Sequence, residues 1–295
     1  MQSKPLVTVI CMCYNHSEFV IESLNSVLDQ NYSNIELIIA DDASTDDSKF
    51  VIEKWLLQHP QIPFIINSKN LGNNKTFNNA FKLSEGEYII DLAADDILLP
   101  NCIEKQLTAF LSPTCQNIGM VYGNAELISC DKKHLEYYYP VNEFKKASSC
   151  PPSGDIYSSV IGYRQYICSV SSMLKRETFI ALDGYDDTLA FEDLDYWFRC
   201  ARNYNIVFID EILVQKRVVQ NSLGSMFRRR MNPHTNKLNH SIYLIVKKAI
   251  VMNKTKEEDK ELLHRIHIEM DKAVRTLNLP LLIQYISLEL KMRFS

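Results

Sequence analysis

Short apolar segments alternate with amphipathic segments through the first ninety residues, and this alternation constrains the fold more than any other feature of the chain. The apolar segments predict strands, and apolar residues at three- and four-residue spacing between them predict helices. Strands are expected at 7–11, 35–40, 63–67 and 87–91, and helices at 18–29, 46–58 and 75–83. Such βαβ crossovers predict an α/β fold with a mostly parallel, Rossmann-like central sheet flanked by helices.

The pattern after residue 100 is less regular. A helix is expected at 101–110, followed by strands at 119–122 and 166–176, a helix at 192–202, and strands at 206–209 and 213–219. Residues 130–162 mix Tyr, Pro, Ser and Lys without a clear period, which is typical of a loop-rich, ligand-facing segment. Beyond residue 227, helices are expected at 236–252, 257–277 and 281–293, with Pro280 as a break.

Charge divides the chain near residue 224. Residues 1–224 contain 18 Lys and Arg against 29 Asp and Glu, a net charge of −11, whereas residues 225–295 contain 14 against 7, a net charge of +7. We therefore expect a main domain over 1–224 and a basic, helical C-terminal extension over 225–295. The extension is expected to dock on the acidic main domain, to form a homodimer contact, or to make a peripheral contact with an anionic membrane.

Composition excludes several classes of protein. No run of 18 apolar residues occurs and the first residues lack the apolar core of a secretory signal, so a cytoplasmic protein is expected, free or on the inner face of the cytoplasmic membrane. Eight cysteines without a Cys-x-x-Cys pair favour reduced, mostly buried thiols. The basic extension lacks interleaved aromatic residues, so no nucleic acid is expected as a partner.

Polar residues follow the predicted strands, at the sheet edge where such folds bind ligands. Tyr14 follows the first strand, Asp42 the second, and Asp95 and Asp96 the fourth. Mg2+ and Mn2+ prefer oxygen ligands and commonly bind one or two carboxylates together with substrate phosphates. The adjacent carboxylates predict a metal site, although acidic residues are also frequent in turns.

Several ordered motifs resemble those of family 2 glycosyltransferases. They are Val-Thr-Val-Ile-Cys-Met-Cys-Tyr-Asn, Glu-Leu-Ile-Ile-Ala-Asp-Asp-Ala-Ser-Thr-Asp, Glu-Gly-Glu-Tyr-Ile-Ile, the pair Asp95–Asp96, and Phe-Glu-Asp-Leu-Asp-Tyr-Trp at 191–197. The resemblance does not reach the extension. It implies a GT-A fold with a nucleotide-binding half at 1–100 and an acceptor-binding half at 101–224. It also implies inverting transfer of one sugar from a UDP-sugar to a glycan or lipid-linked acceptor, in synthesis of a surface polysaccharide such as capsule or lipopolysaccharide.

The resemblance implies a role for each matching residue. Tyr14 would stack beside the base, and Asp42 would accept a hydrogen bond from the uracil imide N–H; the alternative for Asp42 is an N-cap or turn before the next helix. Asp95 would bond the ribose and, together with Asp96, hold Mn2+ or Mg2+, with Asp96 the firmer ligand.

A second carboxylate pair, Glu192 and Asp193, lies at the start of a predicted helix. The resemblance makes Asp193 the catalytic base, since an acceptor hydroxyl becomes acidic only as it attacks. Glu192 is a candidate acceptor-site residue. The alternative for both is compensation of the helix dipole.

The chain departs from the family pattern at two positions. Ala93 stands where many members have an Asp, which leaves the number of metal ligands open. Phe77 stands where relatives often carry Arg; Lys75 either supplies the missing cationic contact to the nucleotide or is a solvated helix residue. The Gln/Arg-x-x-Arg-Trp motif of processive synthases is absent, which favours single-sugar transfer.

Two other functions fit parts of the pattern. A sugar-nucleotide pyrophosphorylase would need a Gly-rich phosphate loop after the first strand, but no Gly occurs before residue 72. A catalytically silent, nucleotide-sugar-binding scaffold protein of a glycan assembly complex is compatible with the empty acidic position at Ala93.

Overall fold

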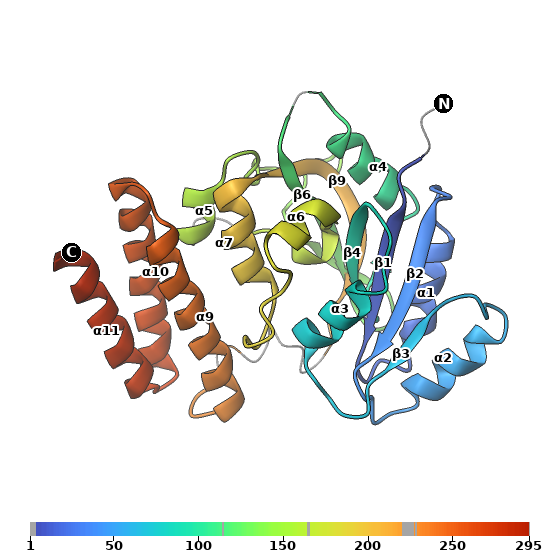
Figure 1. Ribbon diagram of the computed structural model, residues 1–295, viewed down its shortest axis with the longest axis horizontal. Helices are drawn as coiled ribbons and strands as arrows, with labels where there is room; N and C mark the ends of the chain where they lie inside the picture. The colour runs from blue at the N-terminus through green and yellow to red at the C-terminus, as the bar shows by residue number, and fades with distance from the viewer. Residues whose placement is uncertain (1–3, 114, 164–165, 220–226, 228, 295) are drawn as a thin grey trace.

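The computed structural model describes residues 4–113, 115–163, 166–219, 227 and 229–294. Nine strands form one mixed sheet in the order β3-β2-β1-β4-β8-β6-β9-β5, with β7 paired to β6. Helices cover the sheet, and three further helices lie beyond it at the C-terminal side of the molecule (Figure 1). The predicted α/β fold with a C-terminal helical extension is confirmed.

The first half of the main domain matches the predicted alternation. It contains β1 (Val7–Cys13), α1 (Val20–Leu28), β2 (Ile35–Asp41), α2 (Ser48–Leu56), β3 (Phe64–Ile66), α3 (Asn73–Phe81) and β4 (Tyr88–Ala93). These four strands pair in parallel, and β1 is buried along its whole length. Because β1 lies between β2 and β4, the strand order reverses there, and a crevice for a ligand is expected at the carboxyl ends of β1 and β4.

The second half extends the same sheet with mixed pairings. It contains β5 (Ile97–Leu98), α4 (Cys102–Phe110), β6 (Ile118–Ile128), β7 (His134–Tyr137), α5 (Tyr157–Ile161), a 3-10 turn (Ser169–Ser171), β8 (Met173–Lys175), α6 (Arg176–Ala181), α7 (Asp193–Asn203) and β9 (Asn205–Arg217). Strand β8 is antiparallel to both of its neighbours, β4 and β6, and β6 is parallel to β9. Strand β8 therefore joins the two halves of the domain in one sheet.

Two local predictions were wrong in this half. The strand expected at 166–176 is instead the 3-10 turn, β8 and the first residue of α6. The two strands expected at 206–209 and 213–219 are one long strand, β9, because register shifts against β6 absorb the polar residues between them. The segment 130–162 contains β7 and α5 in addition to loops.

The extension consists of α9 (Pro233–Met252), α10 (Lys256–Arg275) and α11 (Leu279–Phe294). Helix α9 packs on α7, and α10 packs on α5 and α11. Ile242, Ile245 and Val246 of α9 are buried in the common core, so this helix docks on the main domain. The domain boundary predicted at residue 224 lies outside the described residues.

The cysteines and the helices of the described residues bear on two predictions made from composition. All eight cysteines are free thiols, and five of them are buried. Within the described ranges, no helix is both long and apolar enough to cross a membrane.

Candidate functional site

The loops after β1 and β2 form one rim at the carboxyl end of the sheet. Asn15 has a positive φ of 59°, and its N–H donates to Ser44 Oγ at 2.9 Å. In return, the Asn15 side-chain oxygen accepts the Thr45 N–H at 2.7 Å. Tyr14 stands on this rim with 44% of its surface exposed. The tied loops thus present an open aromatic ring, as a base-stacking residue requires.

Asp42 is buried directly after β2 and orders the segment that leads into α3. Its Oδ1 accepts bonds from Asn67 Nδ2 (2.9 Å), the Leu71 N–H (2.8 Å) and Thr76 Oγ1 (2.9 Å), and its Oδ2 accepts the Gly72 N–H (2.9 Å). Each carboxylate oxygen has about two lone-pair sites, so Oδ2, which accepts only one of these four bonds, retains a site for one further donor. The N-cap alternative for Asp42 is wrong, because α2 begins only at Ser48.

The pair Asp95–Asp96 lies between β4 and β5, packed against the end of β9. The Arg217 N–H donates to Asp96 Oδ1 at 2.9 Å, and Arg217 Nε donates to the Asp95 carbonyl oxygen at 3.1 Å. Asp96 is only 3% exposed. Asp95 is more open and lies 3.9 Å from His16 Nε2, measured from its Oδ1.

Arg217 is itself held by several neighbours. Its guanidinium pairs with Glu22 of α1 at 2.6 Å, donates to the carbonyl oxygen of Cys130 at 2.8 Å, and lies 4.5 Å from the ring centroid of Phe19. The arginine is 3% exposed. One buried cation therefore ties α1, the loop after β6 and the Asp95–Asp96 turn to β9.

The carboxyl groups of Asp96 and Asp193 both titrate abnormally. Burial, followed by the charge of Asp95, raises the pKa of Asp96 to about 8. Burial, followed by the charge of Glu192, raises the pKa of Asp193 to about 7. The ammonium group of Lys216 counteracts both shifts, lowering both pKa values. One cationic side chain at the end of β9 therefore influences both Asp96 and the predicted base.

Asp193 begins α7, with Glu192 at the N-cap position. Its Oδ1 accepts the Leu194 N–H at 2.6 Å, so the helix-dipole interpretation also fits its position. Asp91 of β4 belongs to the same acidic region: burial, and then the charge of Glu192, hold its pKa well above the usual range, and Asp193 adds to the effect. Burial also raises the pKa of Glu192, and the Asn73 side chain opposes this shift. Three carboxylates, those of Asp91, Glu192 and Asp193 itself, thus influence one another at the predicted base position.

The two departures from the family pattern have structural counterparts. Phe77 is fully buried, with ring centroids 4.8 Å from Tyr185 and 5.8 Å from Phe179, so it is a core residue. Lys75 is exposed on α3, between the buried Asn74 and Thr76. A nucleotide contact by Lys75 stays a prediction.

The carboxylates after β4 fit a cation shared with a diphosphate. Burial and the charge of Asp95 raise the pKa of Asp96, so a cation bound beside the pair would stabilise the ionised form. Among the residues that the structure describes, no group of three or more His, Cys, Asp or Glu side chains is arranged to hold a metal ion. Mg2+ commonly takes one or two carboxylates and completes its shell with phosphate oxygens and water, which matches this donor set.

Sequence reasoning missed several residues of this region. Arg217, Lys216, His16 and Asp91 contact or influence the predicted residues, but none lies in a local motif. Arg217 is 121 positions from Asp96, so only the sheet pairing brings them together. Of these four residues, Asp91 alone stood out in the sequence, because it is a charged residue within an otherwise apolar strand.

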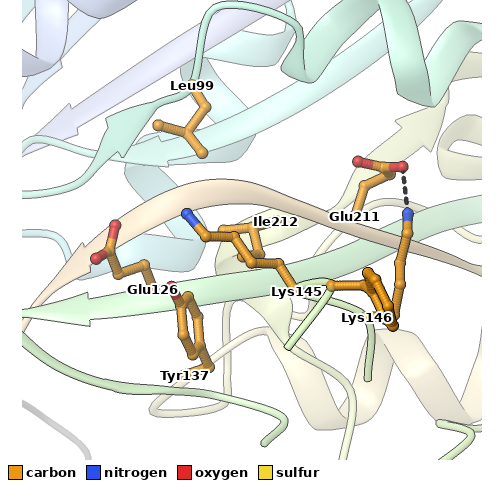
Figure 2. A pocket seen from close by; sticks show the side chains of 8 residues that line it. Leu99, Glu126, Tyr137, Lys145, Lys146, Glu211 and Ile212 are labelled. Atoms are coloured by element: carbon orange, nitrogen blue, oxygen red, sulfur yellow. Dashed lines mark hydrogen bonds and ion pairs between the residues drawn. The ribbon is translucent and has the colours of Figure 1, made fainter. Parts of the chain in front are cut away.

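A cavity lies elsewhere in the second half (Figure 2). It has a volume of about 370 Å3 and is lined by Leu99, Glu126, Tyr137, Phe144, Lys145, Lys146, Glu211 and Ile212. None of the predicted site residues lines it. The candidate site is therefore the rim at the carboxyl ends of β1, β2 and β4, together with the start of α7.

Residues 8–169 match the family model described as glycosyl transferase family 2. An uncharacterized glycosyltransferase of Methanocaldococcus jannaschii is 27% identical over 220 residues, which cover 73% of this chain and 71% of that protein. An uncharacterized glycosyltransferase of Rickettsia felis is 29% identical over 215 residues, or 72% of this chain. The chain spans only 34% of the length of the Rickettsia protein.

Solved structures with a similar fold contain nucleotide sugars. Staphylococcus aureus TarS 1-349 in complex with UDP-GlcNAc has a TM-score of 0.64 at 18% identity, covering 88% of this chain and 70% of that one. Mannosyltransferase PcManGT from Pyrobaculum calidifontis, in complex with GDP-Man and Mn2+, has a TM-score of 0.60 at 16% identity, covering 97% and 74%. At these identities the likeness concerns the fold, and it agrees with the predicted GT-A architecture.

Proposed function

Because the chain belongs to glycosyl transferase family 2, we propose that it transfers one sugar, with inversion, from a UDP-sugar to a hydroxyl of a glycan or lipid-linked acceptor. The observation that supports this proposal is that the charge of Lys216 acts on both Asp96 and Asp193, which favours a common site for the two carboxylates. One carboxylate pair is suited to a diphosphate leaving group and the other carboxylate to an attacking hydroxyl. Capsule or lipopolysaccharide synthesis, in the cytoplasm or at the inner membrane face, is the proposed setting.

The proposed reaction is a single in-line displacement. Asp193, in its ionised form, accepts the proton of the acceptor hydroxyl while that oxygen bonds to the anomeric carbon. The bond from the anomeric carbon to the diphosphate oxygen breaks, and the nucleoside diphosphate leaves with the electron pair. Attack opposite the leaving group inverts the anomeric configuration. Glu192, beside the base, is proposed to contact the acceptor.

Asp95 and Asp96 are proposed to hold Mn2+ or Mg2+ together with the diphosphate. When bound, the metal supplies charge neutralisation for the leaving group. The Mn2+ in the complex of the Pyrobaculum mannosyltransferase supports a divalent ion. Asp95, which is the more open of the two, is also proposed to bond the ribose.

Uridine is the proposed base. Its imide N–H would donate to the remaining acceptor site on Asp42 Oδ2, and Tyr14 would stack beside the ring; Lys75 is proposed as a further nucleotide contact. Cytosine has no proton at this ring nitrogen, so it would leave Asp42 without a donor. The UDP-GlcNAc complex of TarS supports uridine, whereas the GDP-Man complex shows that this fold also accepts guanosine.

We also propose a peripheral membrane contact for the extension. Helix α11 carries a second apolar face, opposite its buried one, and this face is exposed: Leu279, Ile283, Ile286, Leu290 and Phe294. Lys291 and Arg293 lie on the same helix, and the extension as a whole carries a net charge of +7, which complements anionic headgroups. A homodimer contact through the same face is the alternative outcome.

A donor-hydrolysis and transfer assay tests the function. We expect purified protein with Mn2+ to release UDP from one member of a UDP-sugar panel, and EDTA to abolish the release. Asp193→Asn should lower the rate on the order of 100-fold or more, since it removes the base. A GDP- or CDP-sugar panel serves as the base-specificity control.

Two outcomes would contradict the proposal in different ways. UDP release equal in wild type and Asp193→Asn would leave the silent scaffold as the better function, provided that UDP still raises the melting temperature in the presence of Mn2+. Equal thermal shifts with UDP, GDP, CDP and dTDP would overturn the role given to Asp42.

A further inference from the structure

The segment immediately before the proposed base has an irregular backbone and takes its shape from its neighbours. This segment, residues 182–192, joins α6 to α7 and is called the base loop here. Asp183 and Gly184 both have positive φ, 59° and 69°, so the chain reverses sharply at the start of the loop. What holds the loop therefore decides where Asp193 points.

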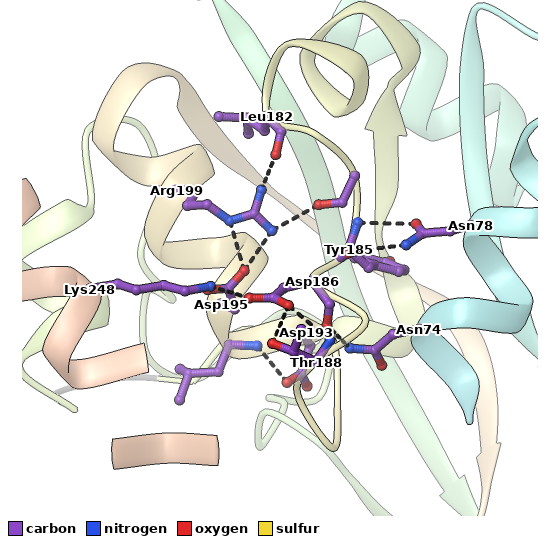
Figure 3. A network of polar contacts seen from close by, with 12 residues as sticks. Asn74, Asn78, Leu182, Tyr185, Asp186, Thr188, Asp193, Asp195, Arg199 and Lys248 are labelled. Atoms are coloured by element: carbon purple, nitrogen blue, oxygen red, sulfur yellow. Dashed lines mark hydrogen bonds and ion pairs between the residues drawn. The ribbon is translucent and has the colours of Figure 1, made fainter. Parts of the chain in front are cut away.

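Helix α3 holds one side of the base loop through two asparagine side chains. Asn74 Nδ2 donates to the Asp186 carbonyl oxygen at 2.7 Å. Asn78 Nδ2 donates to the Tyr185 carbonyl oxygen at 2.7 Å, and the Tyr185 N–H donates back to Asn78 Oδ1 at 3.2 Å. Figure 3 shows both side chains reaching the loop from the side opposite Lys248.

The C-terminal extension holds the other side. Lys248 of α9 donates to Asp186 Oδ2 in the loop and to Asp195 Oδ1 in α7, both at 2.6 Å (Figure 3). Asp186 precedes Asp193 in the chain and Asp195 follows it, so one ammonium group binds a carboxylate on each side of the proposed base in the sequence. A second α9 side chain contributes as well: Ser241 Oγ accepts the Ala190 N–H at 3.0 Å.

The charges around Lys248 are closely matched. Asp195 is 1% exposed, and its other oxygen accepts a bond from Arg199 Nε at 2.7 Å. Burial acts to raise the pKa of Asp186, but the hydrogen bonds from Lys248 and Thr188 outweigh it and lower the pKa to about 2. Asp186 is thus an anion paired with the Lys248 cation, and loss of Lys248 would leave this loop carboxylate to rearrange toward solvent.

We propose that Lys248 is a positioning residue for the transfer reaction: by bridging Asp186 and Asp195, α9 fixes the base loop so that Asp193 faces the acceptor hydroxyl. This proposal rests on the proposed function of Asp193. It makes the extension, which lies outside the family resemblance, part of the machinery of the reaction. Lys248 is proposed to act through Asp186 and Asp195, without a contact of its own to donor or acceptor.

The test compares Lys248→Met, which keeps the length without the charge, with Lys247→Met, an exposed neighbour on α9. We expect Lys248→Met to lower kcat about 10- to 100-fold, as small misplacements of a catalytic group do. The KM for the donor should change less than threefold, because the rim around Asp42 and Asp95 is built by other elements. Lys248→Arg should retain a larger part of the wild-type kcat than Lys248→Met does. Lys247→Met should have the wild-type kcat.

A double-mutant cycle guards against a general folding defect. Asp186→Asn alters the loop end of the bridge with little change in size. If the bridge acts as a unit, the double variant Asp186→Asn/Lys248→Met should be no slower than the slower single variant. Multiplicative losses in kcat would show that the two residues act separately and would overturn the proposal.

Amide hydrogen exchange gives a readout that does not need activity. Peptides covering 182–192 should exchange faster in Lys248→Met than in Lys247→Met, with α1–α2 peptides unchanged. Wild-type kcat and exchange in Lys248→Met would refute the positioning role. A wild-type protein that transfers no sugar would instead refute the proposed function, and exchange would still decide whether Lys248 holds the loop.

Discussion

At the scale of single residues, the titration of Asp193 makes an activity prediction. Glu192 and Asp91 face Asp193 with negative charge, and Lys216 faces it with positive charge; burial is the largest effect, and the net result is a pKa of about 7. A base must be ionised to accept a proton, so kcat/KM should rise with pH and level off above about pH 7. Steady-state assays from pH 5.5 to 9 at saturating metal would measure this. A profile flat below pH 6.5 would contradict the assignment.

The same shift makes a stability prediction. The folded pKa of Asp193, about 7, lies above its ordinary value of 3.8, so the folded state binds the proton more tightly. Stability from this group is therefore fully present below about pH 4 and is lost as pH rises toward 7. Asp193→Asn lacks the titrating carboxyl group, so it does not lose this stability as pH rises. The difference in melting temperature between Asp193→Asn and wild type should therefore grow, in favour of the variant, from pH 5 to pH 8.

The matched control for this comparison is Asp271→Asn, at an exposed carboxylate of α10. Its melting temperature relative to wild type should not increase over the same interval. A gain for Asp193→Asn that is equal at pH 5 and pH 8 would mean that the base is ionised at both values in the folded protein.

At the scale of elements, strand β9 does more than extend the sheet. Its last two residues, Lys216 and Arg217, come near the carboxylates that follow β4 because β9 pairs with both β6 and β5. Arg217→Met should leave Glu22 without its buried partner and the Asp95 carbonyl oxygen without a donor. We expect a loss of roughly 3 kcal/mol in the free energy of unfolding, because buried acceptors lose a charged hydrogen-bond donor, and urea denaturation would measure it.

Two further variants separate the charge of Arg217 from its shape. Arg217→Lys keeps the charge but lacks the planar fork that reaches several acceptors, so most of the loss should persist. Arg293→Met, at an exposed ion pair of α11, should change the free energy of unfolding by roughly 0.5 kcal/mol or less. Full recovery with Arg217→Lys would mean that charge alone matters at this position.

At the scale of the whole molecule, the parts predictable from sequence were those with local signals. Buried parallel strands are continuous apolar runs, so β1, β2 and β4 were identifiable. Roles for Tyr14, Asp42, Asp95 and Asp193 could be proposed because the motifs that contain them resemble those of a known family. Strand β8 was misplaced because three residues carry too little pattern. The contacts of Arg217 and Lys248 were out of reach because side chains far apart in sequence meet only after the sheet and extension have assembled.

Helix α11 makes a prediction at this same scale. Wild-type protein should float with phosphatidylglycerol vesicles, and the fraction bound should fall as salt rises. Ile283→Glu/Leu290→Glu should abolish flotation, whereas Phe50→Glu, at an exposed position of α2, should not. No flotation, combined with a dimer by light scattering that the double variant dissociates, would assign the face to a second copy.

The bridge made by Lys248 also bears on where this protein can be shortened. The stretch that matches the family model ends at residue 169, before Asp193, and the charge boundary lies near residue 224, before α9. A chain cut at residue 224 would lose one side of the support for the base loop, namely α9. A chain cut at residue 169 would lose the base loop and Asp193 themselves, together with β9 and its contacts to Asp95 and Asp96. The smallest piece expected to turn over substrate is thus longer than the part recognisable in relatives, and the divergent C-terminal helices have to be retained with it.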